Sequence, residues 1–264
     1  MSASLPAQTL AAVAARLRSA GCVFAEDEAR LLIAAARTPA ELAAMEQQRM
    51  TGQPLEHVLG WAEFCGLRIA VDPGVFVPRR RTEFLIGQAA GLLGPAPRPV
   101  IVDLCCGSGA LGVALAAAAG RPVDLHATDV DAAAVRCARR NVLPAGGQVY
   151  QGDLDEPLPA GLRGRVGVLL ANVPYVPTGD VALLPAEARE HEARVALDGG
   201  TDGLDVLRRV AAAAPGWLAP GGHLLTEISH RQAAAATAAV AAAGLVPRLA
   251  SSADLGATVL IAAR

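Results

Sequence analysis

The segment VDLCCGSGALG, residues 102–112, is the part of the chain that decides its fold. An apolar run leads into it, Gly107 and Gly109 interrupt it, and an alanine-rich run that favours a helix follows. Glycines at these positions allow a tight turn and let a ligand approach the main chain closely. A strand, a glycine-rich turn and a helix in this order are typical of nucleotide-binding sites in α/β sheets.

Alternating strands and helices extend outward from this turn. Apolar runs predict strands at 99–105, 123–130, 148–153, 165–172 and 222–229, with helices at 110–120, 131–142, 202–218 and 231–244. The last two predicted strands, 245–251 and 257–264, follow one another without a helix, so we expect the final strand to run antiparallel to the rest. The pattern predicts a doubly wound, mostly parallel α/β sheet, in which ligands lie beyond the carboxyl ends of the strands.

The first part of the chain has a different pattern. Apolar residues recur at helical spacing in three short stretches, and Thr38 followed by Pro39 marks the start of the third. Residues 51–81 alternate apolar and polar side chains between glycines, which is typical of a β-hairpin, and a helix is predicted from Thr82 to about Leu93. We therefore expect a helical domain at 1–50, a β-hairpin connector at 51–81 and the α/β domain at 82–264.

Composition narrows the functional classes. The chain has 264 residues, a formal net charge of −2 and no basic tract, which argues against a nucleic-acid partner. Arg16 and Arg18 interrupt the apolar N-terminal stretch, so we expect a helix there, and neither a signal peptide nor a membrane anchor. Five cysteines without CxxC spacing indicate reduced thiols in the cytoplasm. Five histidines without ligand spacing indicate no metal site.

The glycine turn is expected to bind an adenosine-containing ligand. Asp129 follows Gly109 by 20 residues and ends the next predicted strand, where a carboxylate can accept hydrogen bonds from both ribose hydroxyls. Gly107, Gly109 and Gly112 also satisfy G-x-G-x-x-G, so a dinucleotide is one alternative. Asp103, four residues before Gly107, favours S-adenosylmethionine, because it could meet the amino group of that ligand or order the loop.

Residues 172–175, Asn-Val-Pro-Tyr, end the predicted strand at 165–172, and they have no role in hydride transfer. An amide nitrogen is a poor nucleophile, so its methylation requires acceptors that hold both N–H groups and direct the lone pair. The side-chain carbonyl of Asn172 and the main-chain carbonyl of Val173 are candidate acceptors, and Tyr175 can lie against the flat amide. The alternative is a plain turn in which Pro174 ends the strand and Tyr175 covers the sheet edge.

The chain resembles the HemK/PrmC family of protein-(glutamine-N5) methyltransferases over nearly its whole length. Seven segments carry the resemblance in order: the family's connector at 52–83, its cofactor loop at 103–116, its ribose strand at 127–141, its adenine-side loop at 152–159, its Asn-Pro-Pro-Tyr at 172–177, and later signature segments at 196–210 and 226–232. The resemblance implies a class I S-adenosylmethionine-dependent methyltransferase with an N-terminal substrate-recognition domain. It also implies methylation of the Gly-Gly-Gln glutamine of peptide-chain release factors, and so a protein partner and no membrane partner. The sequence does not fix the oligomeric state, for which a monomer is the expectation.

The motifs and the resemblance together give a set of expected site residues. The cofactor-binding residues are Phe76, Asp103, Cys105, Cys106, Gly107, Ser108, Gly109, Asp129, Val130, Asp153, Leu154 and Asn172, and the catalytic residues are Asn172, Val173, Pro174 and Tyr175. Phe76 is equally well explained as a core residue. Cys105 and Cys106 are expected to pack the loop, with a vicinal disulfide or a catalytic thiol as alternatives. Glu227 and Gln232 are interpreted as structural.

Three departures from the family pattern lie near the expected site. Val173 stands where the family has proline, Arg80 and Arg81 replace a Pro-Glu pair, and Ala193 follows Glu192 where proline is expected. The run at 79–81 is either a solvated or acid-facing patch or a grip for carboxylates of a protein substrate. Two rival functions remain open: methylation of an exocyclic amine on a nucleobase, and a cofactor-binding module without catalysis.

Overall fold

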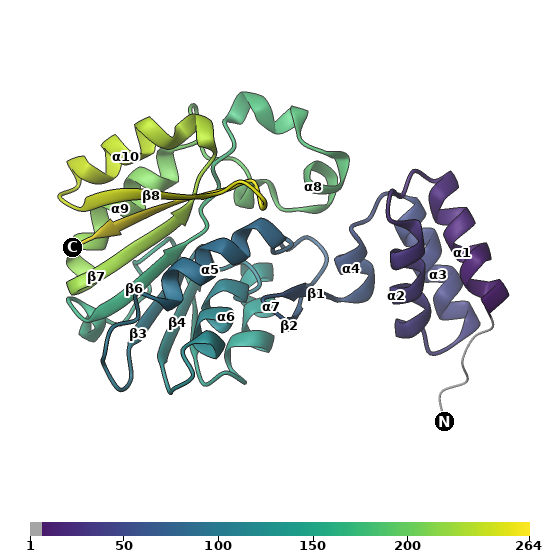
Figure 1. Ribbon diagram of the computed structural model, residues 1–264, viewed down its shortest axis with the longest axis horizontal. Coiled ribbons are helices and arrows are strands. Elements are labelled where there is room, and N and C mark those ends of the chain that lie inside the picture. Colours follow the sequence, from purple (N-terminus) through teal and green to yellow (C-terminus); the bar gives the residue numbers. More distant parts are fainter. Residues whose placement is uncertain (1–6) are drawn as a thin grey trace.

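A seven-stranded sheet with the strand order β5-β4-β3-β6-β7-β9-β8 forms the core of the larger, C-terminal part of the protein, in a computed structural model that describes residues 7–264 (Figure 1). Its strands are β3 (Val100–Leu104), β4 (Asp124–Asp129), β5 (Gln148–Gln151), β6 (Val166–Ala171), β7 (Leu218–Glu227), β8 (Val246–Ser252) and β9 (Ala257–Ala263). Strands β3 to β7 are parallel, whereas β9 is antiparallel to both of its neighbours. The predicted fold class and the antiparallel last strand are therefore confirmed.

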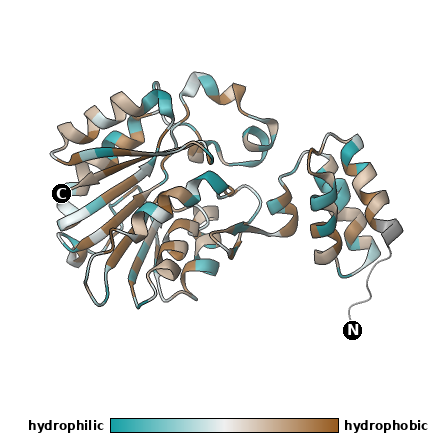
Figure 2. Ribbon diagram, viewed as in Figure 1, coloured by the Kyte–Doolittle hydropathy of each residue, from teal (hydrophilic) through white to brown (hydrophobic). Residues whose placement is uncertain are grey.

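Helices cover both faces of this sheet. One face carries α5 (Glu83–Ala90), α6 (Ala110–Ala118) and α7 (Ala132–Val142), and the other carries α9 (Asp205–Trp217) and α10 (Ala233–Ala242). Strand β3 shows why both faces are covered, because each of its residues is buried. Ile101 belongs to one core cluster and Val100 and Val102 to the other, as alternation along a strand requires. Figure 2 shows the central strands as the most hydrophobic part of this domain.

Three helices form a separate N-terminal bundle: α1 (Ala7–Ser19), α2 (Ala25–Ala35) and α3 (Pro39–Met50). They pack around a core of their own, with Leu17 and Leu32 fully buried. The hydroxyl of Thr38 accepts a hydrogen bond from the main-chain N–H of Glu41 at 3.1 Å, so Thr38 caps α3 as its sequence position indicates. Residues 1–6, with which the predicted N-terminal domain begins, lie outside the described part.

The connector between the bundle and the sheet contains one helix that the sequence pattern did not predict. The hairpin of β1 (Trp61–Phe64) and β2 (Leu67–Ala70) is antiparallel, and α4 (Leu55–Leu59) precedes it. Pro54 begins this short helix, and Gly60 ends it with a φ of 77°. No helix among residues 7–264 combines the length and the apolar character needed to cross a membrane.

A second unpredicted feature is the segment between β6 and α9, residues 178–198, which we call the cover segment. It contains α8 (Ala186–His191) and two 3-10 stretches, η3 (Thr178–Leu183) and η4 (Arg194–Ala196). Isolated parallel bridges join Gly74 to Glu192 and Val176 to Asp198, so both the connector and the end of β6 hold the segment in place. The remaining 3-10 turns are η1 (Arg80–Thr82), η2 (Ala160–Leu162) and η5 (His230–Gln232).

Candidate active site

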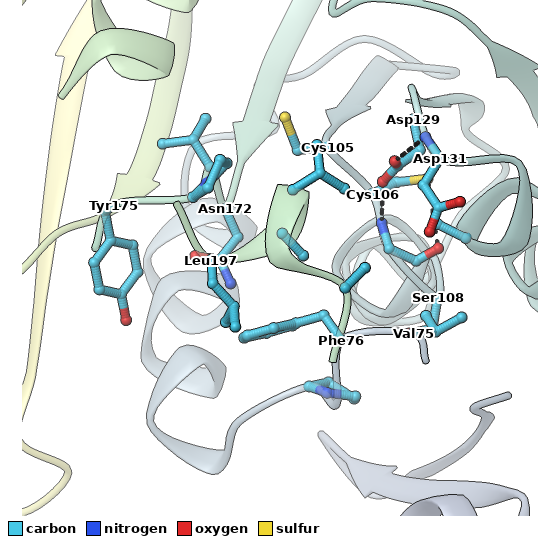
Figure 3. A pocket seen from close by; sticks show the side chains of 18 of the residues that line it. Val75, Phe76, Cys105, Cys106, Ser108, Asp129, Asp131, Asn172, Tyr175 and Leu197 are labelled. Carbon is cyan, nitrogen blue, oxygen red and sulfur yellow. Dashed lines mark hydrogen bonds between the residues drawn. The ribbon is translucent and has the colours of Figure 1, made fainter. Parts of the chain in front are cut away.

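A cavity of about 460 Å³ lies beyond the carboxyl ends of β3, β4 and β6, with the cover segment as one wall (Figure 3). This volume is in the range of small-molecule sites. The lining includes every expected site residue except Gly109: Phe76, Asp103, Cys105, Cys106, Gly107, Ser108, Asp129, Val130, Asp153, Leu154, Asn172, Val173, Pro174 and Tyr175. Residues that are far apart in the sequence thus meet in one cavity, while the role of each remains a prediction.

The glycine turn after β3 has a left-handed backbone at alternate residues. Cys105, Gly107 and Gly109 have φ values of 53°, 55° and 78°. Gly109 is the residue before α6, and a Cβ there would lie 2.6 Å from a methyl carbon of Val142. Gly109 is therefore needed for packing against α7, and it lies behind the loop and not in the cavity wall.

Asp103 links the turn to the expected ligand. It is 1% exposed, and its Oδ2 accepts a hydrogen bond from the main-chain N–H of Gly112 at 2.8 Å, which orders the start of α6. Its Oδ1 is buried and has no hydrogen-bond partner anywhere in residues 7–264. Burial raises the pKa of Asp103 to about 8. An ammonium group at Oδ1 would satisfy this atom and favour the carboxylate, so the site fits the amino group of S-adenosylmethionine.

Asp129 stands at the end of β4 with its carboxylate held in one orientation. Oδ2 accepts from the main-chain N–H of Gly107 at 2.8 Å, and Oδ1 accepts from that of Asp131 at 2.9 Å (Figure 3). Burial raises its pKa. Each carboxylate oxygen can accept a further hydrogen bond, so ribose hydroxyls remain possible partners of this fixed group.

The loop after β5, which the resemblance assigns to the adenine side, contributes Asp153 and Leu154 to the cavity wall. Leu154 has a φ of 49°, and its carbonyl accepts a hydrogen bond from the hydroxyl of Thr128 at 2.7 Å. Asp153 Oδ2 lies 2.7 Å from Arg209 Nη2 of α9, and both residues line the cavity. Arg209 was not among the expected site residues, because it lies on a helix whose sequence carries no separate ligand signal.

Phe76 and Arg79 attach the connector to the cover segment. The Arg79 guanidinium lies 4.8 Å from the centroid of the Phe76 ring, and its Nη2 is 2.5 Å from Glu192 Oε1. Ala193 donates a main-chain hydrogen bond to the carbonyl of Gly74 at 3.1 Å. Proline, which the family pattern places at 193, has no N–H for this bond. The alanine therefore adds a contact that closes one side of the cavity.

The thiols of the loop take no part in disulfide bonding. Cys105 and Cys106 are both free in the structure, so the alternative of a vicinal disulfide is wrong. Burial raises the pKa of each thiol, with nearby carboxylates adding to the effect. A protonated buried thiol is a weak nucleophile, which favours loop packing over a catalytic role.

Asn172 lies at the other end of the cavity, just after β6. Its Oδ1 is buried, and no group within residues 7–264 donates a hydrogen bond to it. Figure 3 shows its side chain with those of Tyr175 and Phe76 around the same part of the cavity. Val173 is 2% exposed and packs in the core, so valine fills the space where the family has proline. A buried carbonyl that has no partner and faces a cavity can accept a hydrogen bond from an N–H group of a ligand in that cavity.

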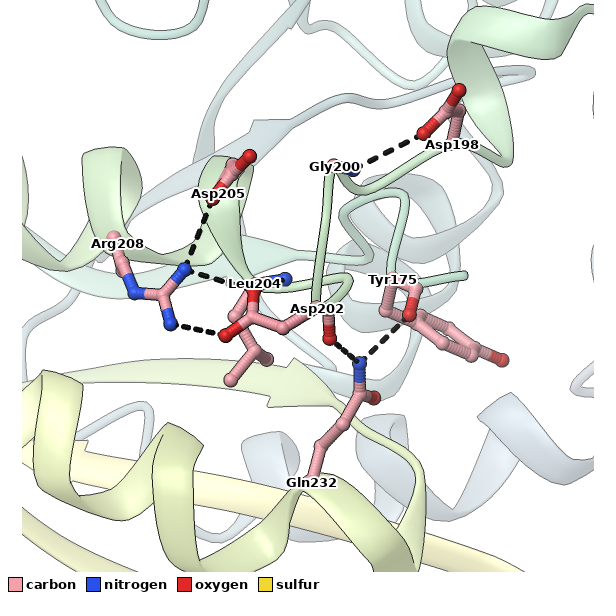
Figure 4. A network of polar contacts seen from close by, with 8 residues as sticks. All are labelled: Tyr175, Asp198, Gly200, Asp202, Leu204, Asp205, Arg208 and Gln232. Atoms are coloured by element: carbon pink, nitrogen blue, oxygen red, sulfur yellow. Dashed lines mark hydrogen bonds and ion pairs between the residues drawn. The ribbon is translucent and has the colours of Figure 1, made fainter. Parts of the chain in front are cut away.

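The loop before α9 and the side chain of Gln232 contact the main chain of residues 172–175, just after β6 (Figure 4). Gln232 Nε2 donates to the carbonyl of Tyr175 at 2.8 Å and to that of Asp202 at 3.0 Å. Gly203 has a φ of 76°, and a Cβ there would lie 2.2 Å from the carbonyl oxygen of Tyr175. Glu227 accepts a hydrogen bond from the Tyr175 hydroxyl at 3.1 Å. Glu227 and Gln232 thus support the expected catalytic segment directly.

Comparison with known proteins gives a consistent picture. The sequence model of the family "Methyltransferase small domain" matches residues 67–200. A release factor glutamine methyltransferase of Geobacter sulfurreducens is 39% identical over 201 residues, which cover 74% of this chain and 68% of that protein. One of Bradyrhizobium diazoefficiens is 34% identical over 272 residues, covering 92% and 89%. A 4-amino-L-phenylalanine/4-methylamino-L-phenylalanine methyltransferase of Streptomyces pristinaespiralis is 37% identical over 205 residues, covering 75% and 68%.

The matched region contains the glycine turn, Asp129 and the strand end with Asn172, so the similarity includes the parts from which the cavity is built. The match to the Bradyrhizobium protein extends over nearly the whole of both chains. The chain belongs to the release factor glutamine methyltransferase family.

Proposed function

We propose that this protein transfers a methyl group from S-adenosylmethionine to the side-chain amide nitrogen of a protein glutamine, the Gly-Gly-Gln glutamine of peptide-chain release factors. The observation that carries the proposal is the buried, unpartnered Oδ1 of Asn172 at the cavity, for which residues 7–264 offer no donor. A glutamine amide would supply that donor. The names of the Geobacter and Bradyrhizobium relatives support the choice of acceptor.

The residues of the strand end would act by holding the amide. When bound, S-adenosylmethionine supplies a methyl group on a positively charged sulfur that is open to attack. Asn172 Oδ1 and the main-chain carbonyl of Val173 would accept the two N–H groups, so that the nitrogen lone pair points toward the methyl group. Burial is the main cause that raises the pKa of Tyr175, and the carboxylate of Glu227 raises it further. The phenol therefore stays neutral, and its ring would serve as a surface for the flat amide and not as a base.

The N-terminal bundle would recognise the substrate protein. Val23 and Phe24, in the turn between α1 and α2, are 84% and 69% exposed, and paired exposed apolar side chains favour a protein contact. Arg49 of α3 lies 2.7 Å from Glu187 of the cover segment, so the bundle is connected to the wall of the cavity. Deletion of residues 1–50 is therefore expected to preserve cofactor binding but to abolish efficient methylation of an intact release factor. Full activity of the shortened protein would contradict this role.

Since its substrate acts in translation, we place the enzyme in the cytoplasm.

The function is tested by incubating the purified protein with labelled S-adenosylmethionine and a release factor. Label should appear in the release factor and be absent from a variant whose Gly-Gly-Gln glutamine is replaced by alanine. Parallel reactions contain 4-amino-L-phenylalanine, RNA or DNA. Transfer only to the free amino acid would move this chain to the activity named for the Streptomyces relative, and transfer only to nucleic acid would favour the nucleobase alternative. Either result would overturn the proposal.

A further inference from the structure

The hydroxyl of Tyr175 belongs to a compact network that includes one of the three departures from the family pattern. Arg81 Nη2 donates to the Tyr175 hydroxyl at 2.5 Å, and Arg81 Nε donates to Glu227 Oε1 at 2.7 Å. The Tyr175 hydroxyl donates to the same Oε1 at 3.1 Å, and the hydroxyl of Thr82 donates to Glu227 Oε2 at 2.7 Å. The Glu227 side chain is 4% exposed, so this carboxylate depends on its three partners.

These contacts hold Tyr175 at both ends. Its phenol oxygen accepts a hydrogen bond from Arg81, its hydroxyl donates one to Glu227, and its main-chain carbonyl accepts one from Gln232 at 2.8 Å. The phenol oxygen lies on the axis of the Cβ–Cγ bond, so fixing this oxygen and the main chain fixes the first side-chain torsion and the position of the ring in the cavity wall. Arg81, Thr82 and Tyr175 all line the cavity, which places the network on the acceptor side.

We propose that Arg81, acting with Glu227, is a positioning residue that sets the position of the Tyr175 ring beside the acceptor amide. The inference rests on the proposed function. A glutamate at position 81, which the family pattern has, could not pair with the buried carboxylate of Glu227. The position of the ring in this chain therefore depends on a cation that the family pattern lacks. Arg80, its exposed neighbour, is the matched control because it has the same charge and is not in the network.

The first test observes the tyrosine and needs no substrate. The chain has two tyrosines, so Tyr150→Phe leaves Tyr175 as the only one, and its ionisation can be followed by ultraviolet absorbance or by ¹³Cζ NMR. The charged groups that face the phenol are Arg81 on η1, which lowers its pKa, and Glu227 on β7, which raises it. In this background, Arg81→Gln should raise the pKa of Tyr175 and Glu227→Gln should lower it, whereas Arg80→Gln should leave it unchanged. Coinciding titrations for all three variants would overturn the proposed network.

The second test separates positioning from stability. Arg81→Gln should lower kcat on the release factor about 10-fold, the effect of losing the one hydrogen bond that holds the Tyr175 hydroxyl, with little change in either KM. Arg81→Lys should recover part of this loss, and Arg80→Gln should behave as wild type. Thermal denaturation identifies any variant that fails to fold, and if Arg81→Gln does so, the comparison of kcat for Arg81→Lys with that for Arg80→Gln decides. Unchanged kcat in a folded Arg81→Gln protein would overturn the positioning role. Failure of the wild-type enzyme on every release factor would contradict the proposed function instead, while the titration would still test the network.

Discussion

Replacement of Asn172 by alanine should change stability and activity in opposite directions. The chain has only two asparagines, and the structure places them in opposite situations. Asn141 is fully bonded: its Oδ1 accepts from the N–H of Ala70 at 2.9 Å, and its Nδ2 donates to the carbonyls of Ala70 and Ser108 at 2.9 and 2.8 Å. The Oδ1 of Asn172, by contrast, is buried without a donor within residues 7–264.

The magnitudes follow from this contrast. A buried polar group without a partner costs about 1–3 kcal/mol, so Asn172→Ala should leave the free energy of unfolding unchanged or raise it by up to about 1 kcal/mol. Asn141→Ala removes three hydrogen bonds and leaves their main-chain partners unsatisfied, so it should lower that free energy by about 1–3 kcal/mol. Turnover should show the reverse order, with Asn172→Ala losing roughly 100- to 1,000-fold in kcat, the effect of removing one positioning group from an active site.

Urea denaturation of the two variants and single-turnover methyl transfer at saturating cofactor provide the measurements. Calorimetry with S-adenosylmethionine should give nearly wild-type affinity for Asn172→Ala, which assigns the loss of rate to the acceptor side. The reasoning is refuted if Asn172→Ala retains near-wild-type turnover on the true substrate. It is equally refuted if this variant is destabilised as much as Asn141→Ala, because its carbonyl would then be bonded within the folded protein.

Three further outcomes are expected. The pKa of Asp103 is raised to about 8 in the fold, above its ordinary value of 3.8, so the folded state binds the extra proton and the ligand-free protein should lose stability as pH rises from about 4 to 8; Asp103→Asn should remove this slope in urea denaturation, and a slope that persists would contradict it. Asp129→Ala should weaken cofactor binding by about 1–3 kcal/mol in calorimetry, while NAD should bind to neither protein; unchanged affinity would exclude the ribose contact. Val173→Pro should be tolerated and raise activity on release factors, because it restores a fixed backbone and keeps the same carbonyl; lost activity with unchanged stability would mean that the valine serves a different nucleophile.

The sequence predicts most of the central domain because its signals are local. Each buried strand of the sheet is an apolar run, and the glycine turn carries its own pattern of positive φ residues. The short helix α4 was missed because the five residues between Pro54 and Gly60 are too few to show apolar side chains repeating at helical spacing. The cover segment was missed because distant contacts hold it, such as the bond from Ala193 to Gly74.

The same distinction applies to the site. Asp103, Asp129 and Asn172 each lie at or next to the carboxyl end of a parallel strand, so their common location follows from the topology alone. The contacts that support Tyr175 do not follow from the topology. Arg81 lies on η1, Glu227 on β7 and Gln232 on η5, and no sequence pattern shows that these elements meet at Tyr175. The sequence allowed an acid-facing run at 79–81 and structural roles for Glu227 and Gln232, and Arg81 does face the carboxylate of Glu227. It could not identify these partners, since pairing between distant positions has no signature in a single sequence.

The place of β9 between β7 and β8 has a consequence for the order in which the chain can fold. Strand β8 is synthesised first but pairs with β9 along its whole length, so it has no place in the sheet until residues 257–263 exist. A chain that stops before Ala257 therefore lacks β9, and β8, although present in the sequence, has no strand with which to pair. The edge of β7 would then be open beside the buried residues Leu224 and Leu225, and an open apolar edge invites pairing with a second copy. Nascent chains interrupted at this point are expected to aggregate and not to accumulate as a smaller, inactive enzyme.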